Sequence, residues 1–173
     1  MRQQLLSSSK WTAAGVVVLL LLQFSSACAQ TASPPVKEKK YAPVAEYDPK
    51  RDAAADIREA IAEAQRTKRN VLLEVGGKWC VWCRIMDEYF EKNADVLSLR
   101  EQNYVTVKIN MSEENENKAV LSQYPDIPGY PHIFVLDSEG KLLHSQFTGD
   151  LEAGKSYDHD KFVEFLKKWS PAR

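Results

Sequence analysis

The sequence lacks an excess of charge of either sign: its 173 residues hold 23 Lys and Arg against 24 Asp and Glu, a net charge of −1. Binding to nucleic acid or to an anionic membrane surface depends on concentrated positive charge, so neither function is indicated. The region beyond residue 48 also lacks internal repeats and low-complexity tracts. A single globular domain with a tail is the simplest organisation that these absences leave.

Cysteine and histidine are both scarce, with three of each. A zinc site usually takes four ligands, and the chain has no second cysteine pair beside Cys80 and Cys83. The histidines are His132, His144 and His159. Covalent haem attachment needs a histidine directly after Cys83, where Arg84 stands. No metal and no external cofactor are therefore expected, and a zinc site or a purely structural disulfide is the less favoured alternative.

Long apolar runs are missing too, because the run near the amino end covers only residues 13–22, whereas a membrane-spanning helix needs roughly 20 apolar residues. A basic opening precedes this run and small residues follow it, which is the layout of a secretory signal peptide over residues 1–29. Cleavage after Ala29 would remove Cys28 with the signal. Two other interpretations stay open: Cys28 is the lipidated first residue of a bacterial lipoprotein, or the run is kept as an anchor helix.

A proline-rich stretch, residues 30–47, follows the signal and is predicted to be a flexible linker. The domain itself is predicted over residues 48–173. Asp48-Pro49 is typical of a helix start, and apolar residues at helical spacing continue the pattern to about Arg69.

Extended and helical patterns then alternate along the chain. A continuous apolar run over residues 71–75 predicts a strand buried on both faces, and alternation predicts a second strand over 104–110. Two strands separated by a polar turn form a predicted β-hairpin, 132–136 and 142–147. Helices are predicted after Cys80, over 113–123, and from Phe162 to Trp169. This order predicts a three-layer α/β/α domain with a mixed central sheet, a parallel portion plus a C-terminal antiparallel hairpin.

The chemistry is expected at Cys80 and Cys83, where a buried strand gives way to a helix. Residues three apart on a helix lie on one face, close enough for a disulfide. A loop this small stabilises little, so the pair indicates redox chemistry. Cys80 comes first and lies nearer the positive helix end, which favours its thiolate. We therefore expect Cys80 to be the exposed, attacking nucleophile and Cys83 the resolving thiol.

Two segments resemble the landmarks of the thioredoxin superfamily. Residues 74–83, EVGGKWCVWC, are similar to its active-site stretch, and closest to secreted thioredoxin-like proteins with a W-C-x-x-C centre. Residues 127–135, IPGYPHIFV, resemble its cis-proline loop leading into the hairpin. The resemblance covers roughly residues 50–170 and implies a thioredoxin-like fold.

The resemblance also implies roles for individual residues. Pro131 would be the cis-proline facing the disulfide, and the Tyr130 backbone would pair with an extended substrate. Trp79 would belong to the substrate-facing surface, and Trp82 is a further candidate for it. Glu74 falls where the family often keeps a buried acid, which would accept the proton of the resolving cysteine.

The sequence departs from the family pattern at three places. Val81-Trp82 replaces the Gly-Pro between the cysteines of thioredoxin, which leaves the direction of the reaction open. Glu74 replaces a shorter Asp. His132 follows Pro131 where Thr is frequent, and its ring is expected either to approach the sulfurs or to face solvent.

The function that these observations predict is thiol-disulfide exchange on protein or peptide substrates, in the bacterial periplasm or cell envelope. Electrons would pass to or from a partner dithiol protein, and a membrane would be involved only through a lipid anchor at Cys28. The alternative is a peptide-binding or chaperone-like module of the same fold without redox turnover. A dedicated electron carrier for one partner is a third hypothesis.

Overall fold

The structure is a computed structural model that describes residues 40–172. The predicted signal peptide 1–29, with Cys28, lies outside the described residues, as does the first part of the predicted linker. Among residues 40–172, no helix has the length and apolar character needed to cross a membrane.

Four strands form one mixed sheet in the order β2-β1-β3-β4. The strands are β1 (Asn70–Gly76), β2 (Tyr104–Asn110), β3 (His132–Leu136) and β4 (Leu142–Phe147). β1 and β2 are parallel, whereas β3 runs antiparallel to both β1 and β4. The predictions of strands over 104–110, 132–136 and 142–147 are confirmed, and the predicted 71–75 strand gains one residue at each end.

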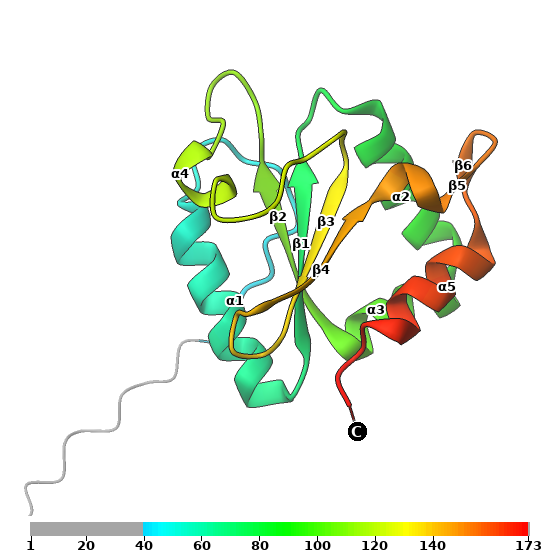
Figure 1. Cartoon of the computed structure of the whole chain (residues 1–173), viewed down its shortest axis with the longest axis horizontal. Coiled ribbons are helices and arrows are strands. Elements are labelled where there is room, and N and C mark those ends of the chain that lie inside the picture. Colours follow the sequence, from blue (N-terminus) through cyan, green and yellow to red (C-terminus); the bar gives the residue numbers. More distant parts are fainter. Residues whose placement is uncertain (1–39, 173) are drawn as a thin grey trace, which may run out of the picture. The chain divides into compact units, whose positions relative to one another are not determined.

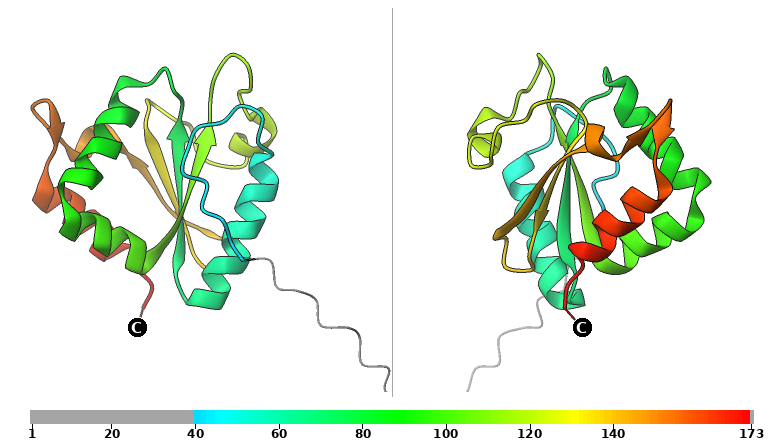
Figure 2. Two further views of the ribbon diagram at one scale, coloured as in Figure 1. Left: turned by 180° about the vertical axis from the view of Figure 1, so that it is seen from behind. Right: turned by 45° about the vertical axis from the view of Figure 1, so that its right-hand side comes forward.

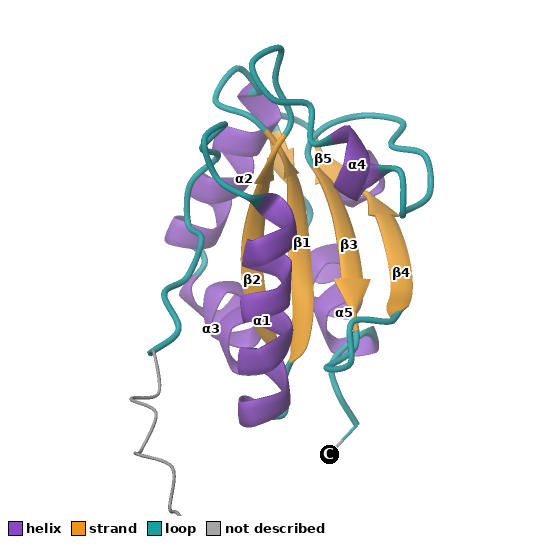
Figure 3. Ribbon diagram, turned by 90° about the vertical axis from the view of Figure 1, so that its left-hand side faces the viewer, coloured by secondary structure: helices purple, strands orange, loops and turns teal. Residues whose placement is uncertain are grey.

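Helices cover both faces of this sheet, so the predicted three-layer α/β/α fold is confirmed (Figures 1 and 3). One face carries α1 (Ala53–Thr67) and the short α4 (Lys118–Leu121). The other face carries α2 (Val81–Lys92), α3 (Ala94–Asn103) and α5 (His159–Lys168). Between β4 and α5 the chain forms three short elements: η1 (Thr148–Leu151), β5 (Glu152–Ala153) and β6 (Ser156–Tyr157).

Strand β1 is buried along its whole length because helices cover it on both sides. Val71, Leu73 and Val75 join the core beneath α1, whereas Leu72 joins the core beneath α2 and α5. Side chains alternate between the two faces of a strand, which places Glu74 on the same face as Leu72. The predicted burial of this strand on both faces is confirmed.

The first helix begins later than predicted. Asp48 and Pro49 form a turn, in which the Asp48 carboxylate accepts from Lys50 N at 2.9 Å. Asp52 then has an extended backbone and caps α1 by accepting from Ala55 N at 3.0 Å. The helical start predicted at Asp48-Pro49 is therefore wrong, because the extended Asp52 interrupts the pattern.

The helix predicted over 113–123 is also wrong, since only α4 is helical there. Ser112 and Asn115 instead close a tight turn through reciprocal backbone hydrogen bonds of 3.2 and 3.1 Å. Asn110 Nδ2 donates to Asn115 O at 2.9 Å, and Asn117 Nδ2 donates to Asn110 O at 2.7 Å. Asparagine side chains that bond the backbone compete with helix formation, so this segment becomes an ordered loop.

Helix α3 has no counterpart in the predicted elements. Its apolar side chains do not repeat at helical spacing, and Val96 is its one buried apolar residue. The final helix stops at Lys168, where Trp169 forms its C-terminal cap.

The amino-terminal segment 40–47 packs against the domain and runs beside the sheet (Figure 2). Val44 forms a parallel bridge with Val107 of β2, and Lys108 N donates to Val44 O at 3.1 Å. Val44 and Tyr47 are both buried. The predicted linker 30–47 is therefore wrong for residues 40–47, because the ordered domain begins before residue 48.

Candidate active site

Cys80 lies in the connection between β1 and α2, and Cys83 lies in the first turn of α2. The two are joined as a disulfide, with their Cα atoms 5.3 Å apart. Cys80 is the N-terminal cap of α2, and its Sγ accepts from Cys83 N at 3.1 Å. The sequence placed Cys80 at the positive end of a helix and Cys83 one turn inside it, and the structure has both in those positions. A thiolate on Cys80 would face an N–H donor and the helix dipole.

Both cysteines are buried in this oxidised form, with 3% of Cys80 and 1% of Cys83 exposed. The expectation of an exposed Cys80 is wrong here, because Tyr47, Trp82 and Tyr130 pack against the pair. Exposed side chains flank Cys80 instead: Trp79 is 56% exposed and Val81 is 55% exposed. The surface around the buried disulfide is therefore formed in part by these two exposed side chains.

Gly76, at the end of β1, allows the side chains of Cys83 and Tyr47 to approach the backbone closely. A Cβ added at this position would overlap Cys83 Sγ and would lie 3.1 Å from the Tyr47 hydroxyl oxygen. The Tyr47 hydroxyl is buried, with no hydrogen-bond partner among residues 40–172. Burial raises the pKa of Tyr47 well above its usual value, and the charges of Glu74 and Asp87 raise it further. A neutral hydroxyl thus lies beside Cys83.

Sequence reasoning missed Tyr47 entirely, since it fell in the predicted linker. A buried aromatic residue at the end of a proline-rich stretch has no motif that marks it. Only its tertiary contacts with Cys80 and Cys83 identify it.

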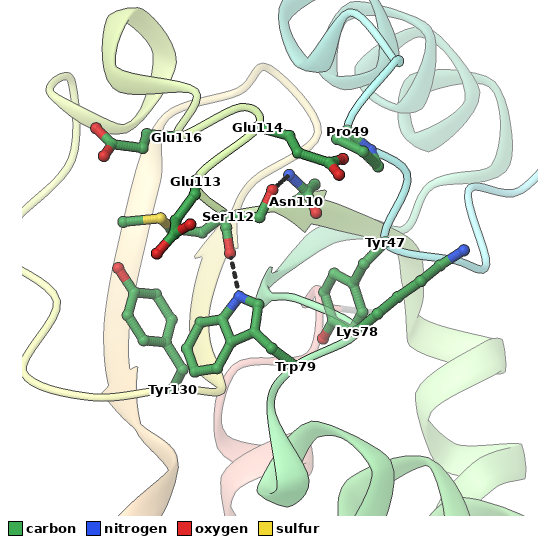
Figure 4. Close-up of a pocket in the computed structure, with 11 residues that line it drawn as sticks. Tyr47, Pro49, Lys78, Trp79, Asn110, Ser112, Glu113, Glu114, Glu116 and Tyr130 are labelled. Atoms are coloured by element: carbon green, nitrogen blue, oxygen red, sulfur yellow. Dashed lines mark hydrogen bonds between the residues drawn. The ribbon is translucent and has the colours of Figure 1, made fainter.

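Trp79 and Tyr130 come together on the surface beside the disulfide. Their ring centroids lie 5.5 Å apart with an interplanar angle of 82°, an edge-to-face contact. Trp79 Nε1 donates to Met111 O at 2.7 Å, which ties the ring to the loop after β2 (Figure 4). The Tyr130–Pro131 peptide bond is cis. The structure thus brings three of the predicted site residues to one end of the sheet.

Trp82 lies differently. Its ring packs edge-on against Tyr157 of β6, with centroids 5.7 Å apart, and it also contacts the disulfide cluster. Trp82 therefore joins the cysteines to the hydrophobic core beneath α2.

Glu74 is fully buried, as the resemblance implied. Arg100 Nη1 donates to its Oε1 at 3.3 Å, and its Oε2 has no hydrogen-bond partner within the described part of the chain. Burial raises the pKa of Glu74, against the lowering effects of Arg100 and Lys108. Lys108 in turn pairs with Asp87 of α2 at 2.5 Å. A raised pKa makes the carboxylate of Glu74 a stronger proton acceptor than an exposed glutamate.

His132 neither faces solvent nor joins the cysteine cluster. Its side chain is on the α1 face of the sheet with Phe134, at 4.7 Å between ring centroids, and 2% of the residue is exposed. Nε2 lies 2.8 Å from Ser145 Oγ. Burial, helped by the charge of His144, lowers the pKa of His132 to about 4. His132 is thus a neutral core residue at neutral pH.

Across residues 40–172, no group of three or more His, Cys, Asp or Glu side chains is arranged to hold a metal ion.

Comparison with known proteins gives consistent matches. The thioredoxin-like family matches residues 52–138. A protein disulfide-isomerase from Ricinus communis is 32% identical over 100 residues, 58% of this chain and 18% of that protein. The thiol:disulfide interchange protein DsbD of Colwellia psychrerythraea is 28% identical over 111 residues, 63% of this chain and 18% of that protein. The chain thus spans about a fifth of the length of these curated relatives.

Among solved structures, a disulphide isomerase from Xylella fastidiosa Temecula1 is similar with a TM-score of 0.61 and 26% sequence identity. The match covers 74% of this chain and 98% of that chain. Nearly the whole of that protein therefore corresponds to the described domain.

Replacing Gly76 by Ala tests the close approach at the disulfide. The added methyl overlaps Cys83 Sγ, so we expect the oxidised protein to lose about 1–3 kcal/mol of unfolding free energy in urea titrations. The same variant after reduction of the disulfide is the control, because Cys83 Sγ can then move away from the added methyl and the loss should be smaller. Wild-type stability of Gly76→Ala would contradict the crowded geometry.

The buried His132 predicts a loss of stability in acid. Its pKa falls from 6.5 to about 4 on folding, so the native state resists protonation. The stabilising contribution is present above pH 6.5 and disappears as the pH falls toward 4, by about 3 kcal/mol. Urea unfolding of wild type and His132→Gln between pH 4 and 7.5 should show a flatter profile for the variant. His159→Gln is the control of opposite sign: the pKa of His159 is raised by its bond to Asp95, so this variant should lose stability toward acid at least as steeply as the wild type. Parallel profiles for wild type and His132→Gln would rule out this role.

Proposed function

The chain belongs to the thioredoxin-like family, and on that basis we propose that it is a thiol-disulfide oxidoreductase acting on proteins or peptides. The observation that carries the proposal is the Cys80–Cys83 disulfide at the start of α2, with Cys80 Sγ accepting from Cys83 N. A disulfide that closes so short a loop adds little stability, whereas its position favours a thiolate on Cys80.

The exchange has two balanced steps. In the reducing direction, the Cys80 thiolate attacks a substrate disulfide, forms a mixed disulfide, and releases one substrate sulfur as a thiolate that takes up a proton. The Cys83 thiol then loses its proton and attacks Cys80 Sγ. The Cys80–Cys83 disulfide forms, the second substrate sulfur leaves, and two electrons have passed to the substrate. The oxidising direction is the reverse.

Glu74 is the proposed acceptor for the Cys83 proton. Its carboxyl is fully buried, its pKa is raised by that burial, and Oε2 has no partner among the described residues. Tyr47 keeps a neutral hydroxyl beside Cys83 Sγ. These groups give the second step a local route for the proton, away from bulk water.

Trp79, Tyr130 and Pro131 form the proposed substrate-facing surface. The backbone of Tyr130, directly before the cis bond, would pair with an extended substrate segment, as a strand adds to a sheet edge. Trp79 would cover the substrate beside its cysteine, since its ring is more than half exposed. Trp82 contributes by holding the cysteine pair against the core.

We place this activity outside the cytoplasm, in the bacterial periplasm or cell envelope. The predicted signal peptide supports that location, as do relatives named thiol:disulfide interchange proteins. A partner dithiol protein would supply or accept the electrons. A lipid at Cys28 would tether the domain to a membrane.

The reduction potential of the cysteine pair tests the function directly. Equilibration in dithiol and glutathione buffers, followed by tryptophan fluorescence, should show a reversible two-electron transition. A midpoint near −270 mV (about the thioredoxin value) would mark a reductase, and one near −120 mV (about the DsbA value) an oxidant.

Cys80→Ser/Cys83→Ser is the control and should show no transition. The single variant Cys83→Ala should accumulate mixed disulfides that Cys80→Ala does not form. Absence of any reversible transition in the wild type would overturn the redox function and favour a peptide-binding module.

Glu74→Gln tests the proton acceptor. Without the carboxylate we expect release of the mixed disulfide to slow by about 10–100-fold near neutral pH, since general base catalysis is lost. The first attack by Cys80 should keep its rate. Stopped-flow measurement of both steps across pH 5–9 separates them: release in the variant should keep only the pH dependence of the Cys83 thiol and lose the part that titrates with Glu74.

Asp87→Asn is the matched control for this experiment. It removes a carboxylate from the same charged network but leaves Glu74 in place. Because Asp87 raises the pKa of Glu74, its loss should shift the pH profile of release to lower pH without abolishing catalysis by Glu74. Equal rates and equal pH profiles for Glu74→Gln and wild type would show that Glu74 has only a structural role with Arg100.

A further inference from the structure

A pocket of about 660 Å³ opens beside the disulfide, within the ~300–1,000 Å³ range of ligand sites. Its lining combines aromatic and acidic side chains: Tyr47, Trp79, Tyr130, Glu113, Glu114 and Glu116. Figure 4 shows these groups around one hollow, with the Glu113 side chain directed toward Trp79 and Tyr130. We call this the acidic–aromatic pocket.

The aromatic wall is held in place. Trp79 is fixed by its hydrogen bond to Met111 O and by its edge-to-face contact with Tyr130. Trp79 directly precedes Cys80, and Tyr130 directly precedes Pro131. A substrate whose cysteine engages Cys80 therefore places a neighbouring side chain at this pocket.

The acidic wall is ordered as well. Glu113 and Glu114 occupy the tight turn between Ser112 and Asn115, which two backbone hydrogen bonds close. No cationic side chain among residues 40–172 pairs with either of these carboxylates, whereas Glu116 pairs with Lys118. Lys78 also lines the pocket, but it faces Glu46 at 3.9 Å. The pocket thus carries uncompensated negative charge.

Tyr47 adds a third aromatic side chain to the wall of the pocket. Its hydroxyl is buried and lies toward Gly76 and Cys83 rather than in the hollow, so it is not offered to a ligand there. The polar groups that the pocket presents to a ligand are therefore chiefly the glutamate carboxylates.

We propose that the acidic–aromatic pocket binds an arginine or lysine side chain next to the reactive cysteine of the substrate. This inference rests on the proposed function. Aromatic ring faces attract cations, and carboxylates pair with them. Arginine fits best, because its planar guanidinium stacks on rings while its N–H groups reach carboxylates. The preferred substrates are therefore proteins with a basic residue beside the cysteine.

The test uses three short peptides that differ only in one residue beside a single cysteine, which is Arg, Glu or Gln. Each cysteine is capped as a mixed disulfide with 2-mercaptoethanol. The rate of reduction by the reduced full-length protein is measured in stopped flow. It is divided by the rate with dithiothreitol, which corrects for the intrinsic reactivity of each peptide.

We expect the corrected rate for the Arg peptide to exceed that for the Glu peptide by about tenfold or more at low salt, and the ratio to shrink as salt rises. Glu113→Gln/Glu114→Gln should bring the ratio close to one. Glu113→Lys/Glu114→Lys should invert it. Glu139→Gln/Glu164→Gln, which changes the net charge equally at two exposed sites away from the pocket, should leave the ratio as in wild type.

The results distinguish the charge selectivity of the pocket from the oxidoreductase activity itself. Equal corrected rates for all three peptides, or an unchanged ratio in the Glu113/Glu114 variants, would overturn the pocket while leaving the oxidoreductase intact. Failure to reduce any of the three peptides would instead overturn the proposed function itself.

Discussion

Burial of strand β1 on both faces determines where the chain can turn, and the disulfide lies at that turn. Val71, Leu73 and Val75 fill one core and Leu72 the other, so the strand cannot slide or flip without exposing apolar side chains. Its last residue, Gly76, is thereby fixed against Cys83 and Tyr47. The positions of Cys83 and Tyr47 relative to each other therefore depend on how the core holds β1.

Strand β1 also carries Glu74, a carboxyl group whose burial costs folding free energy. Glu74 has no exposed surface, and a buried carboxylate is tolerated only when it is paired or protonated. Arg100 from α3 supplies the pairing, while Lys108 sits opposite Glu74 in the sheet and is held by Asp87. Helix α3, whose apolar pattern is weak, thus brings the Arg100 guanidinium to the buried Glu74 carboxylate.

The sequence pattern predicted the structure correctly where the residues of one strand or helix are enough to determine that element. The strands, the hairpin, the three layers and the cysteine pair at a helix start were all predictable because apolar periodicity and spacing encode them. Prediction failed where contacts between segments far apart in the sequence set the structure. Such contacts dock Val44 and Tyr47 on the domain and bury His132. The 112–117 loop combines local asparagine bonds, which leave no apolar periodicity, with a distant one from Asn115 Nδ2 to Pro49 O at 2.8 Å.

The docking of residues 40–47 also covers part of an edge of the sheet. β2 is an edge of the sheet, and an uncovered edge is a template for pairing with another chain. The bridge between Val44 and Val107 and the bond from Lys108 N to Val44 O occupy part of that edge with the chain's own backbone. Segment 40–47 thus places Tyr47 against the cysteine pair and covers part of the β2 edge that could pair with another chain. A shortened protein that begins after residue 47 would lose Tyr47 from the site and would expose this part of the edge.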